Sequence, residues 1–134
     1  MKEIGFNELY EIAKSKLNPR KISPLIEAGG VSAAILTENG NVYTSVCIDT
    51  ACSLGMCAER NAIANIITNG ESKIRKLVCC MTDGKVGTPC GACRELLMQL
   101  DKNSGNIDIL LNYETMETIK LKDIIPMWWG GEGF

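Results

Sequence analysis

The sequence contains no histidine. This absence excludes a Ser-His-Asp triad, a Cys-His nucleophile pair and any metal site with histidine ligands. A metal ion in this protein must therefore be bound by thiolates or carboxylates. A general base must be an aspartate, glutamate, lysine, tyrosine or cysteine side chain.

Basic charge and long apolar runs are also scarce. The net charge is -2 and the pI about 5.2, and the densest basic cluster is Lys73, Arg75 and Lys76. Polynucleotide binders usually carry a larger basic stripe. No apolar run approaches the length of a membrane span, and the charged first 17 residues lack the apolar segment of a secretory signal. We therefore expect a cytoplasmic protein that binds a small molecule, and neither a polynucleotide nor a membrane.

Length and composition are those of an ordinary globular chain. The 134 residues are 46% hydrophobic and 22% charged, which predicts one domain over residues 1–134 with a core that needs no disulfides. The chain nevertheless holds seven cysteines. In a reducing compartment such a number favours metal binding or catalysis over disulfide bonds.

Hydrophobic periodicity predicts an α/β fold. We expect helices over residues 6–17, over 57–68 and from Cys90 onward, with a short helix over 121–125. The expected strands are residues 31–37, 42–48, 76–82, 107–111 and 117–121, with Asn39-Gly40 as a hairpin turn. Loops are expected over 19–30, 49–56 and 83–89. Because helices alternate with strands in the second half, the chain should form a mixed sheet flanked by helices.

A C-x-x-C motif, Cys90-Gly-Ala-Cys93, follows Pro89 at the expected start of a helix. This position places both sulfurs on one helical face, and the helix N-terminus favours the thiolate form. The motif alone fits a thioredoxin-like redox site or half of a zinc site equally well.

A second motif, Cys57-Ala58-Glu59, also lies at an expected helix start. If the two helix N-termini are adjacent, three thiolates can bind Zn²⁺ and leave its fourth position open, as in catalytic zinc sites. Glu59 is not needed as a ligand and is available to move protons.

Three thiolates on one Zn²⁺ leave a net charge of -1, which would weaken the metal as a Lewis acid. A guanidinium that donates to the sulfurs would withdraw this excess charge. Arg60, three residues after Cys57, and Arg94, four residues after Cys90, are the two candidates.

The stretches GMCAERNAI and PCGACREL, with 32 residues between Cys57 and Cys90, resemble the cytidine deaminase family. VSAAILTENGNVYTS resembles the family's first hairpin, so the similarity spans most of the chain. The all-cysteine motif is that of the small class of the family, whose layout blasticidin-S deaminases share. The resemblance implies a three-layer α/β/α fold with a mixed five-stranded sheet, one zinc per subunit, and a homotetramer whose active sites are completed by neighbouring subunits.

The resemblance also implies roles for individual residues. The zinc ligands would be Cys57, Cys90 and Cys93, Glu59 would be the proton shuttle, and backbone groups around Ala58 and Thr88 would hold the heterocycle. Water activated by zinc would attack C4 of cytidine, deoxycytidine or a related free aminopyrimidine nucleoside. Glu59 would protonate N3 and then the amino group, which leaves as ammonia from a uridine-type product.

Two departures from the family pattern leave the substrate open. The Asn-x-Glu motif that grips the ribose is replaced by Cys47-Ile48-Asp49, and the loop to Cys57 is one residue shorter. The tail MWWGGEGF resembles the end of blasticidin-S deaminases, which makes Trp128 a further substrate-binding candidate. Deamination of blasticidin S or another modified aminopyrimidine is therefore the alternative.

Other interpretations remain for several of these residues. Cys90 and Cys93 could serve a thiol oxidoreductase, and Cys47 or Cys52 could complete a structural zinc site as a fourth ligand. Asp49 could cap a turn instead of contacting a sugar.

Two further groups of residues have an apolar interpretation. Cys79 and Cys80 lie in an apolar stretch, where buried cysteines behave as small hydrophobic residues. Trp128, Trp129 and Phe134 could anchor the core or a subunit interface.

Overall fold

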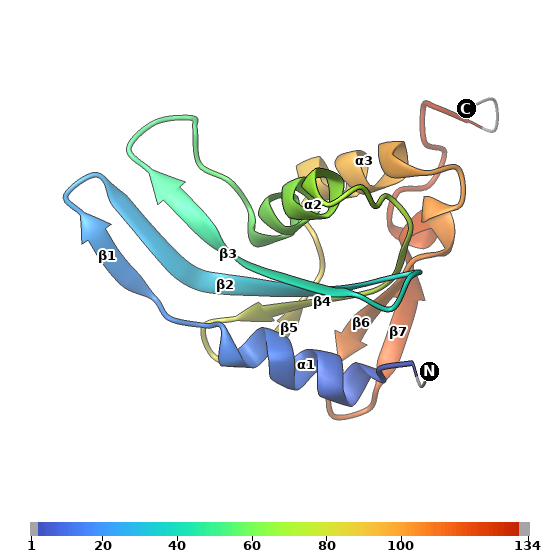
Figure 1. The fold of residues 1–134 in the computed structure, drawn as a ribbon, viewed down its shortest axis with the longest axis horizontal. Coiled ribbons are helices and arrows are strands. Elements are labelled where there is room, and N and C mark those ends of the chain that lie inside the picture. Colours follow the sequence, from blue (N-terminus) through green and yellow to red (C-terminus); the bar gives the residue numbers. More distant parts are fainter. Residues whose placement is uncertain (1–2, 132–134) are drawn as a thin grey trace.

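A mixed seven-stranded sheet, covered by helices on both faces, forms the described part of the chain, residues 3–131 of a computed structural model (Figure 1). The helices are α1 (Phe6–Ser15), α2 (Ala58–Thr68) and α3 (Gly91–Leu100), with short 3₁₀ turns η1 (Ser104–Asn106) and η2 (Leu121–Ile124). The strands are β1 (Arg20–Ser23), β2 (Ile26–Thr37), β3 (Val42–Thr50), β4 (Ile74–Met81), β5 (Val86–Gly87), β6 (Asp108–Asn112) and β7 (Glu117–Lys120).

The long strand β2 organises the sheet. It pairs with β3 on one side, and on the other side with β1 through its first residues and with β4 through its second half. The order then continues from β4 to β6 and β7, while β5 pairs with β4. Only the β4–β6 pairing is parallel among the strands described. The sheet is therefore mixed, as the sequence predicted, but it has seven strands where the family resemblance implied five, because the short strands β1 and β5 join it.

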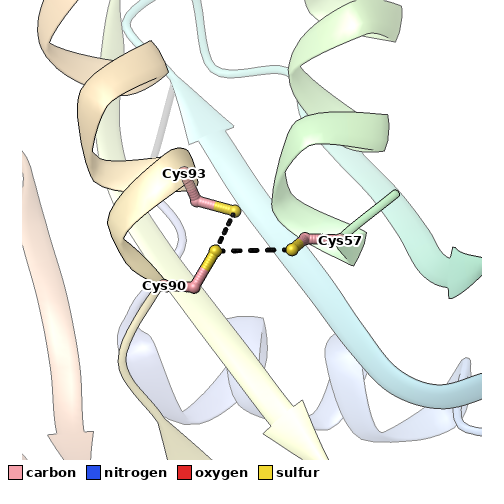
Figure 2. A group of neighbouring side chains, drawn as sticks. All are labelled: Cys57, Cys90 and Cys93. Carbon is pink, nitrogen blue, oxygen red and sulfur yellow. Dashed lines mark hydrogen bonds between the residues drawn. The ribbon is translucent and has the colours of Figure 1, made fainter. Parts of the chain in front are cut away.

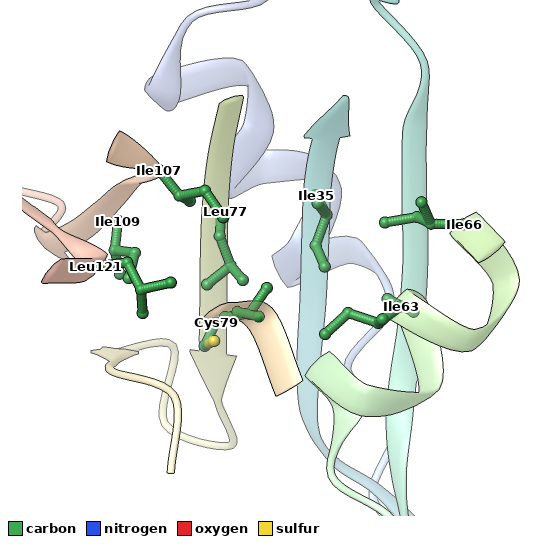
Figure 3. Close-up of a cluster of buried hydrophobic side chains, with 10 residues drawn as sticks. Ile35, Ile63, Ile66, Leu77, Cys79, Ile107, Ile109 and Leu121 are labelled. Carbon is green, nitrogen blue, oxygen red and sulfur yellow. The ribbon is translucent and has the colours of Figure 1, made fainter. Parts of the chain in front are cut away.

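Both faces of the central strands are buried, which explains why their sequences read as continuous apolar runs. In β4, Leu77 and Cys79 join the core beneath α2 and α3 (Figure 3), whereas Val78 and Cys80 join the core beneath α1. Cys79 and Cys80 are 2% and 0% exposed. The expectation that these two cysteines are buried is confirmed.

The strand and helix predictions were largely correct, but two loops were not. All five expected strands are present, whereas residues 19–30 form β1 and the start of β2, and the short strand β5 lies inside the expected loop 83–89. Gly29, at φ +86°, lies where the β2–β3 register shifts between Ala28 and Ser32. This bulge lets β2 continue through the Gly29-Gly30 pair, which the sequence suggested was a loop. Strand β1 was missed because its exposed residues lack the apolar alternation that marks a strand.

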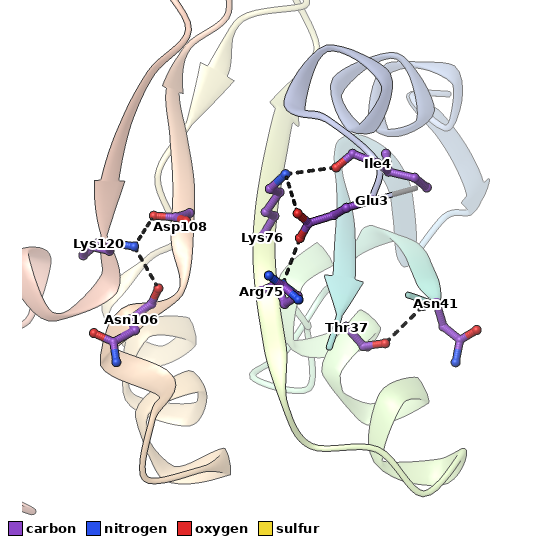
Figure 4. A network of polar contacts seen from close by, with 9 residues as sticks. All are labelled: Glu3, Ile4, Thr37, Asn41, Arg75, Lys76, Asn106, Asp108 and Lys120. Atoms are coloured by element: carbon purple, nitrogen blue, oxygen red, sulfur yellow. Dashed lines mark hydrogen bonds and ion pairs between the residues drawn. The ribbon is translucent and has the colours of Figure 1, made fainter. Parts of the chain in front are cut away.

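The side-chain carboxylate of Glu3 partly neutralises the basic cluster of Lys73, Arg75 and Lys76. Arg75 lies 2.8 Å and Lys76 3.8 Å from oxygens of Glu3, and a separate pair joins Lys120 to Asp108 at 2.7 Å (Figure 4). Two of the three basic side chains, Arg75 and Lys76, thus form ion pairs within the chain. None of the helices within residues 3–131 has the length and apolarity needed to cross a bilayer.

Candidate zinc centre and substrate pocket

Three cysteine sulfurs meet where the N-termini of α2 and α3 approach each other (Figure 2). Cys57 and Cys90 are the N-cap residues of α2 and α3, and Cys93 lies in the first turn of α3. Each N-cap carbonyl starts its helix, accepting from Asn61 N–H at 3.0 Å and from Arg94 N–H at 2.9 Å. Neither cysteine side chain makes a cap hydrogen bond. The backbone therefore begins each helix while the sulfurs stay available for another ligand.

The sulfur geometry fits one zinc ion. Cys57 Sγ lies 3.4 Å from Cys90 Sγ, which lies 3.3 Å from Cys93 Sγ, and all three sulfurs are within 4.8 Å of one another. Tetrahedral ligands at a Zn–S distance of about 2.3 Å are about 3.8 Å apart. The observed spacing lies around that value, and it is far longer than the roughly 2.05 Å of a disulfide bond.

No fourth protein ligand joins this group within residues 3–131. Cys47 and Cys52, the two candidates for a fourth ligand, are free cysteines outside the cluster. Three protein ligands and an open position are typical of catalytic rather than structural zinc. The donor set therefore fits a Zn²⁺ that retains a position for water or substrate.

The pKa values of Cys93 and Cys90 are shifted in opposite directions from that of an ordinary thiol. Burial raises the pKa of Cys93, and the nearby charge of Glu59 adds to this effect. Burial acts in the same direction on Cys90, but hydrogen bonds from the backbone of Cys93 and from the neighbouring sulfurs leave its pKa below the usual value. A dense group of thiols that shares its protons in this way is suited to losing them to a cation.

Arg60 supplies a positive charge beside the cluster. Its Nη2 lies 3.9 Å from Cys57 Sγ, and the hydrogen bond to Cys57 is the main cause that raises the pKa of the guanidinium. Its Nε is buried without a hydrogen-bond partner among the described residues. An orphaned donor next to a thiol cluster is consistent with a guanidinium held there by thiolate charge.

Arg94, the second arginine candidate, lies elsewhere. Its guanidinium donates to the carbonyl oxygens of Pro89 (2.7 Å) and Ile124 (2.8 Å) and to Thr88 Oγ1 (3.3 Å). Side chains in a helix point towards its N-terminus. The Arg94 side chain therefore extends to the loop that precedes Cys90 and does not bind the sulfurs. Its hydrogen bonds within the described chain go to these oxygens, in contrast to the expected contact with thiolates.

Glu59 is buried and lines the same pocket as Cys57 and Cys90. The residue is 5% exposed although it is charged, and it follows Cys57 by two positions in the first turn of α2. Beneath it, Cys79 in β4 has a pKa raised first by burial and then by the charge of Glu59. A buried carboxylate beside an open metal position is suited to proton transfer.

A pocket of about 600 Å³ extends from the cysteine cluster along β3. Ala58, Glu59, Thr88 and Cys90 line one part of it, and Cys47 and Asp49 line another. This volume is within the usual range for small-molecule sites.

Cys47 and Asp49 are linked to each other and to β2. Cys47 Sγ accepts the Val31 N–H at 3.3 Å, and its thiol lies 3.8 Å from Asp49 Oδ2. Asp49 belongs to β3, directly opposite Glu27. The pocket edge thus presents an exposed carboxylate that a thiol orients, and no turn begins at Asp49.

The aromatic tail is bound to α3. The indole nitrogens of Trp128 and Trp129 both donate to Glu95, at 3.0–3.2 Å, and Trp129 is 76% exposed. Trp128 is not among the residues that line the pocket within the described chain. Its position favours the interpretation as an anchor, while Phe134 lies outside the described residues.

Several pocket residues carried no recognisable signal in the sequence. Met81 and Thr82 line the pocket from the end of β4, and Thr82 Oγ1 donates to the Gly30 carbonyl at 2.6 Å. Ser45 donates to the Ala58 carbonyl and connects β3 to the start of α2. Such contacts depend on the pairing of strands that are distant in sequence, so no local sequence motif predicts them.

Comparison with known proteins agrees with this geometry. A family model described as the cytidine and deoxycytidylate deaminase zinc-binding region matches residues 11–105. A cytidine deaminase of Sporosarcina psychrophila is 37% identical over 76 residues, which is 55% of each chain. One from Mycobacterium tuberculosis is 28% identical over 97 residues, 72% of this chain and 69% of that protein.

A solved structure supports the same fold. The crystal structure of cytidine deaminase from Mycobacterium tuberculosis superposes with a TM-score of 0.77 at 24% identity, covering 96% of this chain and 99% of that one. At this identity the likeness establishes the fold, whereas the family model spans all three clustered cysteines and Glu59. The chain belongs to the cytidine and deoxycytidylate deaminase zinc-binding family.

Proposed function

We propose that this chain, acting as one domain over residues 1–134, hydrolyses the amino group of cytidine or deoxycytidine to give the uridine-type nucleoside and ammonia. One observation carries the proposal: Cys57, Cys90 and Cys93 form a sulfur cluster, and two of them, Cys57 and Cys90, line the same pocket as the buried Glu59. Membership of the deaminase family supports the reaction type.

Cys57, Cys90 and Cys93 would hold the zinc ion. Bound there, the ion would supply a Lewis acid that makes water a stronger nucleophile towards C4 of the pyrimidine. The donor set and the absence of a fourth ligand within residues 3–131 support this assignment. Arg60 would offset the negative charge of three thiolates through its contact with Cys57 Sγ at 3.9 Å.

Glu59 would transfer the protons. Its carboxylate would take a proton from the attacking water and deliver it to N3. It would then take the remaining proton of the hydroxyl added at C4 and pass it to the amino nitrogen, so that the carbonyl forms as ammonia leaves. Burial supports this role because a side chain at 5% exposure exchanges protons with the pocket more directly than with bulk solvent.

The rest of the pocket would orient the nucleoside. The first N–H groups of α2 lack helical partners, and the Ala58 carbonyl is already engaged by Ser45. The Ala58 N–H and the backbone at Thr88 would therefore hold the heterocycle. Asp49, oriented by Cys47, would accept a hydrogen bond from a sugar hydroxyl at the other part of the pocket.

The oxidoreductase alternative leaves part of the site unexplained. A dithiol reaction at Cys90 and Cys93 needs neither Cys57, whose sulfur lies 3.4 Å from Cys90, nor the charge of Arg60 beside it. A redox site would also give no role to a buried Glu59.

The experiment is a substrate panel combined with metal analysis. Purified protein should contain about one zinc per chain and should release ammonia from cytidine and deoxycytidine. Turnover of blasticidin S but of neither nucleoside would replace the substrate while keeping the chemistry. Protein without zinc and without activity on any aminopyrimidine, but with a reversible Cys90–Cys93 disulfide, would overturn the proposal.

We further propose a cytoplasmic homotetramer. Exposed large apolar side chains support association: Leu25 is 67%, Leu54 78% and Trp129 76% exposed. Light scattering at micromolar concentration should give four times the chain mass of 14.6 kDa. A monomeric mass with full activity would reject this assembly.

A further inference from the structure

The loop that presents Cys90 has little support of its own. It consists of Thr88 and Pro89 between the two-residue strand β5 and the start of α3. Cys90 is exposed, and its side chain makes no cap hydrogen bond. A metal ligand at such a junction needs other contacts to fix its position, because zinc binding depends on the orientation of its ligands.

Arg94 provides these contacts from one helical turn away. Its Nε donates to the Pro89 carbonyl at 2.7 Å and its Nη2 to Thr88 Oγ1 at 3.3 Å. The Arg94 N–H donates to the Cys90 carbonyl at 2.9 Å. One residue thus binds each of the three positions that lead into α3, and the planar guanidinium fixes two of them at once.

The same guanidinium also binds the C-terminal segment, defined as residues 121–131. Its Nη1 donates to the Ile124 carbonyl at 2.8 Å. The adjacent Glu95 accepts the indole N–H groups of Trp128 and Trp129. The Gln99 side-chain amide also donates to Glu95, at 2.7 Å, so three donors hold this carboxylate in place.

We propose that Arg94 is a positioning residue that connects the C-terminal segment to the Cys90 loop and so holds the zinc site in its binding geometry. The proposal rests on the proposed zinc site. The acceptors of Arg94 are neutral oxygens, and the ion pairs of the described chain join other residues. The role of the guanidinium is therefore to order the loop, and the aromatic tail contributes by holding the segment against α3.

The test measures zinc release from the holoprotein to a colorimetric chelator. Arg94→Met keeps an unbranched apolar side chain but removes the guanidinium donors, and should release zinc about tenfold faster, at the lower end of the range for supporting residues of metal ligands. Arg94→Lys keeps the charge, but its single ammonium nitrogen cannot span acceptors that three guanidinium nitrogens contact. This variant should be intermediate. Glu95→Ala, which frees the two indoles, should give a smaller increase.

Controls separate this role from general stability. Arg75→Met, which removes the ion pair with Glu3, should leave zinc release unchanged. Hydrogen exchange of the amides over residues 88–92 should rise in Arg94→Lys and Glu95→Ala, which also serves if Arg94→Met does not fold. The proposal is overturned if the Arg94 variants lose thermal stability with and without zinc equally while zinc release stays at the wild-type rate. Wild-type protein without zinc would instead overturn the proposed function.

Discussion

Replacing Glu59 by glutamine removes a proton acceptor from the pocket and changes little else. The two side chains have nearly the same size, and the site is 5% exposed, so the replacement fills the same space above Cys79. Glu59 is outside the sulfur cluster, so zinc content should stay at one ion per chain. The expected loss is therefore confined to proton transfer.

The magnitude follows from what a positioned acid-base contributes. General acid-base catalysis typically supplies 10²- to 10⁴-fold, and each factor of ten corresponds to about 1.36 kcal/mol. Glu59→Gln should thus lower kcat by at least 10²-fold, a barrier increase of about 3–5 kcal/mol. KM for cytidine should change less than about threefold, because the proposed contacts of the sugar and ring come from other residues.

The assay follows the absorbance change as cytidine becomes uridine, with zinc content and thermal unfolding measured on the same sample. Glu38→Gln, an exposed glutamate at the end of the β2 hairpin, is the matched control and should keep wild-type kcat. If Glu59→Gln retains wild-type kcat at full zinc occupancy, Glu59 is not the proton shuttle and the mechanism is wrong.

Three further predictions follow from the same geometry. Cys93→Ala should reduce bound zinc below about a tenth of an ion per chain and abolish deamination. Cys80 is also fully buried, but in the core beneath α1, so Cys80→Ala should keep zinc and activity. Equal zinc content in the two variants would contradict the ligand assignment. Asp49→Asn should raise KM for cytidine roughly tenfold with little change in kcat, since hydrogen bonds to charged groups contribute about 1.5–3 kcal/mol; an unchanged KM would remove Asp49 from the sugar contact. Hydrogen bonds from Thr37, Tyr43 and Asn41 lower the pKa of Glu71. The charged carboxylate therefore stabilises the fold at pH values above the ordinary pKa of glutamate, and this stabilisation is lost as the pH falls through the lowered pKa. Glu71→Gln should therefore unfold more easily than wild type at pH 7, with the difference shrinking below about pH 4 in chemical denaturation; a difference independent of pH would contradict this.

The zinc centre was accessible from the sequence because its elements are local. Cys57 and Cys90 each precede a clear apolar helix, and the short spacing to Glu59 and Cys93 fixes which side chains share each first turn. Only the adjacency of the two helices required tertiary information, and there the family resemblance supplied what periodicity could not. The expected strands followed from apolar runs buried on both faces.

The residues that sequence reasoning misplaced are those whose partners are distant in the chain. Arg94 was a candidate to contact sulfur because of its spacing from Cys90, but its guanidinium binds oxygens instead, including the Ile124 carbonyl, 30 residues away. The β1–β2 edge was read as a loop because exposed edge strands lack apolar alternation. Trp128 had two interpretations, a substrate contact and an anchor of the core or an interface, and its contact with Glu95 on α3 could not be read from the sequence. Spacing along one helix can be read from sequence, whereas contacts between elements cannot.

The absence of histidine and the presence of Arg60 can be understood together. A zinc ion with three thiolates and no neutral imidazole carries excess negative charge, which would make it a poor Lewis acid. The helix N-termini at Cys57 and Cys90 each present partial positive charge to the sulfurs. Arg60 adds a full charge at 3.9 Å from Cys57 Sγ, and its Nε is buried without a hydrogen-bond partner within residues 3–131. An orphaned buried donor costs about 1–3 kcal/mol, and this cost supports the proposal that the charge serves the metal rather than the stability of the fold.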